Sequence, residues 1–432
     1  MNYFNPNLKA IIIAGGEGTR IRSISDKPKC LFKYNKNFLL EIIYQKLIKN
    51  NIKDITLISG YKSELIKKKL KRKLKNIKLI KETIPLGTAG CLKLIPNNKK
   101  DILLIFGDLL FDLDIKRVFE FHKKKKSDLT LFVHPNSHPY DSDLVVKDLN
   151  SKLIRIIKKP HKIGLVYNNL VMMGVFLISK ELLYSLKNKK DKKLDFTKDF
   201  IISLLKKKKK IFCYETREYC KDMGTPDRYN ETLKDYKACK PSIFNFQKKL
   251  PAIFLDRDGV INKDLGPFKY SDPLDIYKDV FLALKLINKS NYLSVLITNQ
   301  PHVAKGFITM KYLSNSFKKL ETKLGDNKIY LDKIYFCPHY PVSGFKGEIK
   351  KLKINCKCRK PKIGLLLSAK KDLNIDMNKS YFIGNSEVDY NTALNAGVKP
   401  IIIRNKLFNI KGAIKKKNLL QAVRQILKKE NS

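Results

Sequence analysis

The sequence lacks the features that would direct a chain into or through a membrane. No apolar run approaches the ~20 residues needed to span a bilayer. The N-terminal stretch MNYFNPNLKAIIIAGG has no basic region followed by an apolar segment of signal-peptide length. We therefore expect a cytoplasmic protein with no membrane partner.

Acidic residues and arginines are also scarce. The 432 residues include 89 basic and 40 acidic ones, which gives a net charge of +49, but only 11 of the basic residues are arginines. Such a charge favours binding to nucleic acid or to an anionic membrane. However, proteins that read DNA grooves or bind phosphates through two hydrogen bonds mostly use arginine, which is scarce here. The lysine runs at 123–126 and 206–210 have no interleaved aromatic residues for base stacking. We therefore predict no specific nucleic-acid partner. We attribute the excess of basic over acidic residues mainly to compositional drift, and attraction of small phosphorylated substrates is the alternative explanation.

The remaining sequence has the organisation of a two-domain α/β protein. Its length predicts two or three domains. Short β-branched runs alternate with amphipathic, lysine-rich stretches, a pattern typical of a mostly parallel, doubly wound sheet. A polar segment bracketed by prolines interrupts this alternation, which AIFLD then resumes. We predict two doubly wound domains, at residues 1–240 and 251–432, joined by a linker at residues 241–250.

A glycine-rich segment, AIIIAGGEGTRIRSISDKPK, follows the first predicted strand. Gly15, Gly16 and Gly18 have no side chains to prevent backbone N–H groups from closing around phosphates. Arg20 and Lys29 follow at positions suited to neutralise a triphosphate and the charge that develops during phosphoryl or nucleotidyl transfer. The segment is neither a Walker A loop nor a GxGxxG motif. It therefore indicates a nucleotide site of another kind.

With GTR and PK in this order, the segment resembles the signature of sugar-1-phosphate nucleotidyltransferases. Further along, ETIPLGTAG resembles that family's base-recognition loop, and FGD and KDMGTPDRY contain Asp108 and Asp222. The resemblance implies a Rossmann-like, GT-A-like domain in which these two aspartates bind Mg²⁺. It implies catalytic roles for Arg20 and Lys29. It also implies the following nucleotide-binding residues: Ala14, Gly15, Gly16, Gly18, Thr19, Leu86, Gly87 and Thr88.

The reaction that this resemblance implies is attack by a sugar-1-phosphate oxygen on the α-phosphorus of an NTP, which releases pyrophosphate. Lys159 is similar to the family's sugar-phosphate-binding lysine, although Lys158 replaces the acidic residue that precedes it. The stretch from His134 to Val145 resembles the heptose-1-phosphate guanylyltransferase branch. GTP is therefore the preferred NTP by resemblance, while no single residue distinguishes guanine from adenine, cytosine or uracil.

The second half begins with AIFLDRDGVIN, in which a DxDGV motif ends an apolar run. It resembles the nucleophile motif of haloacid-dehalogenase-type (HAD) phosphatases, which implies a HAD-like Rossmannoid domain. By that resemblance Asp256 attacks phosphorus, while Asp258 protonates the leaving alkoxide and then activates water. Thr298 binds phosphoryl oxygens, and Lys360 compensates the charge of the intermediate. Asp256, Asp258 and Asn385 are the implied Mg²⁺ ligands.

Three cysteines and one histidine in the second half have the spacing of a closed, structural Zn²⁺ site, as two close pairs: Cys337, His339, Cys356 and Cys358. This arrangement, directly before RKP, resembles the D-glycero-D-manno-heptose-1,7-bisphosphate 7-phosphatases, and the likeness covers nearly all of residues 251–405. It implies that residues 264–267 and 298–301 line the substrate pocket. The sugar-phosphate-binding residues it implies are Asp264, Thr298, Asn299, Arg359 and Lys360.

Two positions depart from the phosphatase pattern. The family's GDKxxD motif reads GNSEVD here, so Asn385 offers Mg²⁺ a neutral oxygen, which binds more weakly than a carboxylate. The lysine expected next is Ser386. Glu387 or Asp389 is a candidate to compensate, and reduced phosphatase activity is the alternative. Pro301 also removes one backbone N–H donor from the TNQ loop.

The two halves make chemical sense together, because removal of the 7-phosphate from a heptose 1,7-bisphosphate yields a heptose 1-phosphate. We therefore predict a bifunctional enzyme of nucleotide-activated heptose synthesis that uses an NTP and heptose phosphates. Another sugar, a regulatory pseudophosphatase domain and a basic zinc-containing nucleic-acid-binding protein are the alternatives. Self-association is left open by the sequence.

Overall fold

The computed structural model describes residues 7–74, 76–96, 99–185, 193–264, 274–404 and 413–429. Contacts divide the chain into two compact units, each of which is described by itself. The first unit comprises Met1–His134, Val145–Lys158 and Met172–Gln247. The second comprises Pro135–Leu144, Lys159–Val171 and Lys248–Ser432.

The first unit is built on a nine-stranded sheet. Its main path runs through β10 (Leu153–Ile157), β9 (Leu144–Lys147), β11 (Val171–Ile178), β6 (Asp101–Phe106), β1 (Leu8–Ala14), β4 (Ile55–Ser59) and β5 (Ile77–Lys81). Beside β11, β8 (Leu129–His134) pairs in parallel with β12 (Ile211–Glu215). The strands β6, β1, β4 and β5 are parallel, and β11 runs antiparallel to β6. β1 is rich in isoleucine because a central strand with parallel neighbours is buried on both faces.

Amphipathic helices accompany this sheet. In α4 (Ile115–Lys124), the residues Ile115, Val118 and His122 are buried at helical spacing, and the Asp114 side chain caps the first turn by accepting a hydrogen bond from the Arg117 backbone. The other α-helices before the linker are α1 (Leu39–Lys49), α2 (Ser63–Lys73), α3 (Gly87–Gly90), α5 (Lys180–Tyr184), α6 (Ile202–Lys206) and α7 (Pro226–Lys237).

A separate two-stranded antiparallel sheet brings two distant parts of the first unit together. It pairs β7 (Leu109–Phe111) with β13 (Cys220–Asp222), and its register places Asp222 opposite Leu109. The Met223 backbone N–H also donates to the Asp108 carbonyl, at 3.1 Å. Asp222 at the end of β13 and Asp108 in the turn directly before β7, which are far apart in the sequence, therefore lie close together.

The second unit contains a fully parallel six-stranded sheet. Its order is β16 (Lys333–Cys337), β15 (Leu293–Asn299), β14 (Ala252–Leu255), β17 (Tyr381–Gly384), β18 (Lys399–Ile403) and β19 (Ile414–Lys416). The strand order reverses direction at β14, where the chain goes first to β15 and later to β17. Ligand sites of open α/β sheets form at the carboxyl ends of strands at such a switch point.

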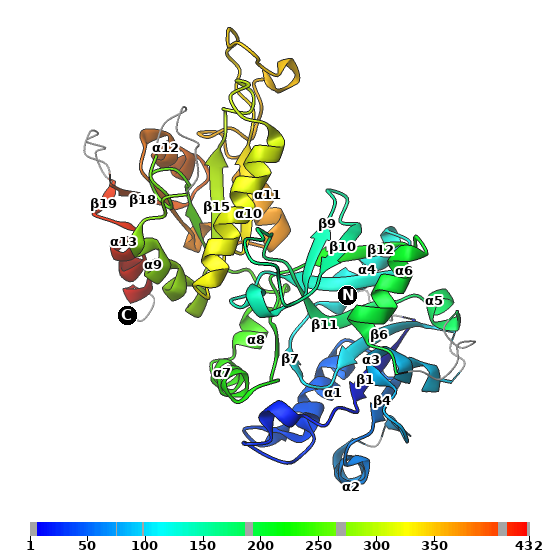
Figure 1. The fold of residues 1–432 in the computed structure, drawn as a ribbon. Coiled ribbons are helices and arrows are strands. Elements are labelled where there is room, and N and C mark those ends of the chain that lie inside the picture. The colour runs from blue at the N-terminus through cyan, green and yellow to red at the C-terminus, as the bar shows by residue number, and fades with distance from the viewer. Residues whose placement is uncertain are drawn as a thin grey trace. The chain divides into compact units, whose positions relative to one another are not determined.

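Five longer helices surround this parallel sheet: α9 (Lys278–Lys289), α10 (Met310–Asp326), α11 (Gly364–Leu373), α12 (Glu387–Asn395) and α13 (Leu419–Lys428) (Figure 1). Helix α10 buries Leu313, Phe317, Leu320 and Leu324, which repeat every three or four residues and form one apolar face. Helices α9 and α13 pack against each other. The core of the second unit therefore lies between these helices and the sheet.

The predicted linker is ordered at both of its ends. Within the first unit, short α8 (Lys240–Ile243) leads to Asn245 and Phe246, which are buried. The Phe246 backbone N–H donates to buried Glu218, at 2.9 Å. Within the second unit, Leu250 forms a parallel bridge to Ile375. The division between the units falls at Gln247–Lys248, inside the predicted linker, and the predicted boundaries of the domains remain a proposal.

The predicted fold class is confirmed: the chain is mixed α/β with Rossmann-like parallel strands in both units. The antiparallel β11 adds a feature that the strand–helix alternation did not indicate. Within the described ranges, no helix combines the length and apolar character needed to cross a bilayer.

Candidate active sites

The glycine-rich loop and the predicted base-recognition loop lie against each other in the first unit. A Cβ atom on Gly15 would come within 2.4 Å of Glu82 Oε2, so a side chain at Gly15 would displace the Glu82 carboxylate. The other Glu82 oxygen accepts a hydrogen bond from the Leu86 backbone, at 2.7 Å. Gly18 has φ +64, a conformation that glycine adopts without strain. These contacts bring together the two segments that contain the predicted nucleotide-binding residues, and the roles of those residues remain proposals.

The carboxylates predicted to bind Mg²⁺ lie beside two of the predicted catalytic cations. Lys29, in a short 3₁₀ helix at Lys29–Leu31, places Nζ 2.8 Å from Asp108 Oδ2. A Cβ atom on Gly224 would lie 2.7 Å from Asp222 Oδ1 and 3.3 Å from Arg20 Nη2. Two carboxylates from neighbouring parts of the fold are a donor set that suits Mg²⁺. The fold therefore assembles the acidic pair and both cations from three separate sequence segments.

Arg228 was missed by the sequence analysis. Its Nη1 atom lies 3.1 Å from each of the two Asp222 carboxylate oxygens, and the Gly224 N–H donates to Oδ1 at 2.9 Å. The side chain extends from the first turn of α7, which Thr225 caps with its hydroxyl. The indicative signal was an arginine six residues after Asp222 in the same motif.

Lys159, the predicted sugar-phosphate ligand, belongs by its contacts to the second unit. Its backbone N–H donates to Asp143 Oδ1 at 3.1 Å, and its Nζ donates to the Asp141 carbonyl at 2.5 Å. The side chain is exposed. These contacts are all local, so the proposed role of Lys159 rests on the sequence resemblance.

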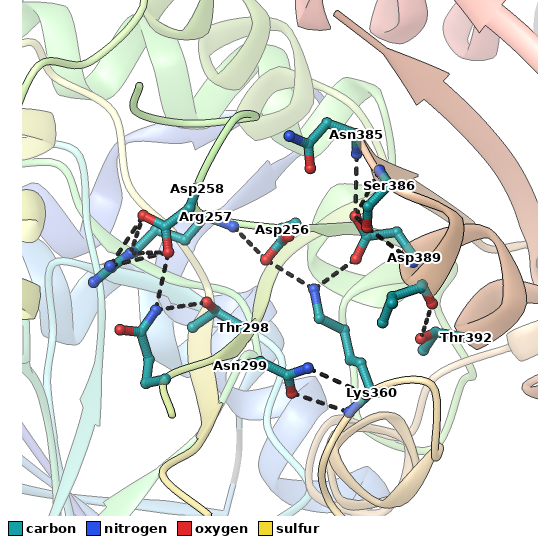
Figure 2. A network of polar contacts seen from close by, with 12 residues as sticks. Asp256, Arg257, Asp258, Thr298, Asn299, Lys360, Asn385, Ser386, Asp389 and Thr392 are labelled. Carbon is teal, nitrogen blue, oxygen red and sulfur yellow. Dashed lines mark hydrogen bonds and ion pairs between the residues drawn. The ribbon is translucent and has the colours of Figure 1, made fainter. Parts of the chain in front are cut away.

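In the second unit the predicted catalytic residues gather at the carboxyl ends of the central strands (Figure 2). Asp256 follows β14, and Lys360 lies with Nζ 2.8 Å from Asp256 Oδ1 and 2.6 Å from Asp389 Oδ1. The Lys360 side chain is only 3% exposed. The Asn299 side chain, at the end of β15, holds the Lys360 backbone through two hydrogen bonds of 3.0 and 3.2 Å. One buried ammonium group thus lies between two carboxylates.

This burial changes the protonation chemistry of Asp256. Desolvation, followed by the neighbouring Asp389 carboxylate, raises the pKa of Asp256 to about 7, although Lys360 acts in the opposite direction. Burial alone would lower the pKa of Lys360, but Asp256 and Asp389 together raise it. Lys360 is therefore charged at neutral pH and stabilises the ionised form of Asp256.

Asp258, the proposed acid and base, is held by three side chains. Arg257 donates to both of its oxygens, from Nε and Nη2, each at 3.0 Å. Asn262 and Gln300 donate to it at 3.0 and 3.1 Å. Gln300 also donates to the Thr298 hydroxyl at 2.9 Å, which links Asp258 to the predicted phosphoryl-binding residue. Asn262 was not identified from the sequence, although its position four residues after Asp258 in the same loop was a signal.

The segment that departs from the phosphatase pattern has a defined local structure. Ser386 caps α12, and Asp389 Oδ2 accepts hydrogen bonds from the Asn385 and Ser386 backbones and from the Ser386 hydroxyl. Both Asp389 oxygens are thus engaged, since Oδ1 binds Lys360, and Glu387 is exposed. Asn385 lies against the nucleophile loop, where a Cβ atom on Gly259 would come within 1.9 Å of its Nδ2. The carboxylate of Asp256 and the amide oxygen of Asn385 form a donor set that suits Mg²⁺.

The predicted zinc ligands converge. The four ligand atoms of Cys337, His339, Cys356 and Cys358 all lie within 4.8 Å of one another. The sulfur–sulfur distances among the three cysteines are 3.1 to 3.5 Å. A Cys₃His set this compact has the chemistry of a closed tetrahedral Zn²⁺ site, and zinc remains a proposal.

Cationic and aromatic side chains surround the loop that carries the cysteines. Arg359 lies 5.0 Å from the centroid of the Tyr340 ring, and Lys305 lies 4.2 Å from it. Lys353, whose side chain is 5% exposed, lies 3.2 Å from Glu348 and 5.2 Å from the same ring. Of the predicted pocket residues, Asp264 is exposed, while residues 265–267 lie outside the described ranges.

Comparisons with known proteins match both halves of the chain. Residues 9–238, more than half of the chain, match the family described as "Nucleotidyl transferase". The C-terminal region is similar to the D-glycero-beta-D-manno-heptose-1,7-bisphosphate 7-phosphatase of Salmonella typhi, at 37% identity over 161 residues, which covers 37% of this chain and 84% of that protein. The protein of the same name from Haemophilus ducreyi is 39% identical over 153 residues, which covers 35% of this chain and 81% of that protein.

Two solved structures also resemble parts of the chain. HddC from Yersinia pseudotuberculosis has a TM-score of 0.46 and 24% identity, and covers 53% of this chain and 99% of its own. The D,D-heptose 1.7-bisphosphate phosphatase from B. bronchiseptica, complexed with magnesium and phosphate, has a TM-score of 0.37 and 25% identity, and covers 42% of this chain and 99% of its own. The family assignment rests on the family match and the sequence relatives.

Proposed function

We propose that this chain, which belongs to the nucleotidyl transferase family and, through its C-terminal region, to the D-glycero-β-D-manno-heptose-1,7-bisphosphate 7-phosphatase family, catalyses two reactions of nucleotide-activated heptose synthesis. The observation that carries the proposal is the presence of both families in one chain. The phosphatase reaction yields a heptose 1-phosphate, which is the class of substrate that a sugar-1-phosphate nucleotidyltransferase consumes. The product would supply the assembly of surface polysaccharide or lipopolysaccharide.

In the second unit, the Asp256 carboxylate attacks the phosphorus of the 7-phosphate, and the bond between phosphorus and the sugar oxygen breaks. Asp258 gives a proton to the departing sugar oxygen, then takes one from the water that hydrolyses the aspartyl-phosphate. Lys360 keeps Asp256 ionised through its 2.8 Å ion pair. Arg257, Asn262 and Gln300 orient Asp258 for both proton transfers.

In the first unit, the loop from Gly15 to Gly18 binds the triphosphate with backbone N–H groups. Arg20 and Lys29 balance the negative charge that develops when a sugar-phosphate oxygen attacks the α-phosphorus and pyrophosphate leaves. Glu82 supports the binding site by holding the Leu86 backbone. GTP is the proposed nucleotide, by resemblance.

Metal ions complete both proposed sites. Asp108 and Asp222 would hold Mg²⁺ in the transferase site, and Asp256, Asp258 and Asn385 would hold it in the phosphatase site. When bound, Mg²⁺ supplies charge neutralisation at the reacting phosphates. A Zn²⁺ ion on the Cys₃His set would fix the loop that leads into Arg359 and Lys360.

The test is to incubate the purified chain with each anomer of heptose 1,7-bisphosphate and each NTP in turn, and to measure phosphate and pyrophosphate separately. We expect phosphate from the bisphosphate alone, and pyrophosphate only when a heptose 1-phosphate and the preferred NTP are both present. Asp256→Asn should abolish phosphate release but leave transfer to heptose 1-phosphate intact. Asp108→Asn should have the converse effect.

The phosphatase assignment and the transferase assignment are tested by separate results. Absence of phosphate release from both anomers would contradict the phosphatase assignment. Absence of nucleotide-heptose from heptose 1-phosphate with every NTP would contradict the transferase assignment. Preference for a hexose phosphate would retain the chemistry and change the sugar.

A further inference from the structure

Each of the two carboxylates in the proposed transferase site has a cationic partner. Lys29 lies 2.8 Å from Asp108, and Arg228 lies 3.1 Å from both oxygens of Asp222. The sequence resemblance assigned a role to Lys29 but none to Arg228. Arg228 is therefore a basic residue of this site whose function is unassigned.

We propose that Arg228 is a positioning residue that competes with the divalent cation for Asp222, and so lowers the affinity of the site for free metal ion. This inference rests on the proposed transferase function. A metal ion that binds Asp222 needs at least one carboxylate oxygen, and Arg228 engages both. The Gly224 N–H, which donates to Oδ1, remains to orient the carboxylate when the guanidinium moves away.

The position of Arg228 allows such a movement. Its side chain is 21% exposed, and it extends from the first turn of α7, whose backbone is fixed separately by the Thr225 cap. An ion pair with this exposure is weak, because water screens it. The guanidinium is therefore able to leave Asp222 without disturbing the helix.

The charges of the site affect whether a metal ion enters alone or together with the nucleotide. Asp108 and Asp222 carry two negative charges, and Lys29 and Arg228 carry two positive charges, so the group as a whole is neutral. Arg20 adds a further positive charge beside Gly224. A free divalent cation gains little from entering a site without net negative charge, whereas one that enters with a triphosphate brings compensating charge with it. Arg228 thereby favours metal that arrives with the nucleotide.

The experiment measures Mn²⁺ binding to the full chain without nucleotide, by the electron paramagnetic resonance signal of free Mn²⁺. The transferase site is isolated as the difference between each form and the same form carrying Asp222→Ala. We expect Arg228→Gln to tighten Mn²⁺ binding at this site about two- to fivefold, as expected for loss of a weak competing ion pair. Arg228→Lys keeps the charge but lacks the forked guanidinium, and should give a smaller change.

Arg155→Gln is the matched control, because Arg155 is an exposed residue of the same unit and the substitution removes the same charge. It should leave Mn²⁺ binding unchanged. Unchanged or weaker binding in a folded Arg228→Gln protein, judged by unchanged hydrogen exchange of the β1 backbone amides in the first unit, would overturn the inference while leaving the transferase proposal standing. If Asp222→Ala removes no Mn²⁺ site from any form, the proposed metal site fails together with the inference.

Discussion

In the proposed transferase site each acidic residue has its own cation, whereas in the proposed phosphatase site one lysine serves two acidic residues. The transferase pairs, Lys29 with Asp108 and Arg228 with Asp222, have side chains that are 20–33% exposed. Water therefore screens them, and each pair can open at small energetic cost.

The phosphatase site is drier and more negative. Lys360 is 3% exposed, and its two partners, Asp256 and Asp389, are 14% and 1% exposed. With Asp258 and Arg257 included, three carboxyl groups face two cations, which leaves one net negative charge when all three are ionised. A site of this kind would attract a divalent cation in the absence of substrate, while the transferase site, which has no net negative charge, would depend on the charge of the nucleotide. The two sites, as proposed, would hold the same metal and differ in what brings it in.

The largest expected effect comes from removing the lysine of each site. Lys360→Met leaves Asp256 and Asp389 facing each other in a buried environment, so it should destabilise the second unit by about 3–5 kcal/mol. Lys29→Met breaks a partly exposed pair and should destabilise the first unit by less than about 1 kcal/mol. Hydrogen exchange of the backbone amides of β14 and of β1 reports the stability of each unit separately.

Each variant provides the control for the other, because both exchange a lysine for a methionine and affect different units. Exchange in β1 should be unchanged in Lys360→Met, and exchange in β14 unchanged in Lys29→Met. Equal destabilisation by the two substitutions would show that burial does not distinguish the sites.

The fold could be predicted because its signals are local. Isoleucine-rich β1 is apolar apart from Lys9, and the four residues AIFL of β14 are all apolar, as is typical of strands with parallel neighbours on both sides. The antiparallel direction of β11 depends on where the chain returns to the sheet, which no local pattern in Val171–Ile178 specifies. The ordered structure of the linker segment could not be predicted from the sequence either, because it depends on a hydrogen bond that the Phe246 backbone N–H donates to Glu218.

The site residues also divide into those that local motifs indicate and those whose contacts depend on the tertiary fold. Resemblance to the phosphatase motifs identified Asp256 and Lys360, and the structure places these two residues 2.8 Å apart. The sequence analysis did not identify the contact of Arg228 with Asp222, because it depends on the turn at Gly224 and on the start of α7. It also left Asp389 open as a replacement metal ligand, whereas both Asp389 oxygens are engaged by Lys360 and by the cap of α12.

The next expected effect concerns Asn385, the neutral residue of the phosphatase site. Asn385→Asp adds one negative charge beside Asp256, so the Mg²⁺ concentration that gives half-maximal phosphate release should fall about tenfold, as metal affinity follows ligand charge. Phosphate release as a function of Mg²⁺ concentration measures this directly. The Mg²⁺ dependence of nucleotidyl transfer in the same protein is the control and should not change. An unchanged requirement in the phosphatase reaction would show that Asn385 does not contact the metal.

The smallest expected effect is a shift in pH dependence. Burial and then Asp389 raise the pKa of Asp256 to about 7. Because Asp256 attacks as the carboxylate, kcat/KM for phosphate release at limiting Mg²⁺ should decline as the pH falls through that value, by up to about tenfold per pH unit. Asp389→Asn removes one of the charges that raise this pKa and leaves Lys360 to Asp256 alone. The midpoint should therefore move to lower pH, by about one unit or less.

Profiles of kcat/KM between about pH 5 and 9, recorded for both proteins with the same substrate, measure this shift. The substrate phosphate also titrates near pH ~6, but equally in the two experiments, so the difference between the midpoints belongs to the enzyme. Nucleotidyl transfer should have the same profile in both proteins, because Asp389 lies in the other unit. A midpoint that stays in place or moves to higher pH would mean that Asp389 does not act on the nucleophile. The phosphatase site would then resemble the transferase site, with each carboxylate balanced by its own cation.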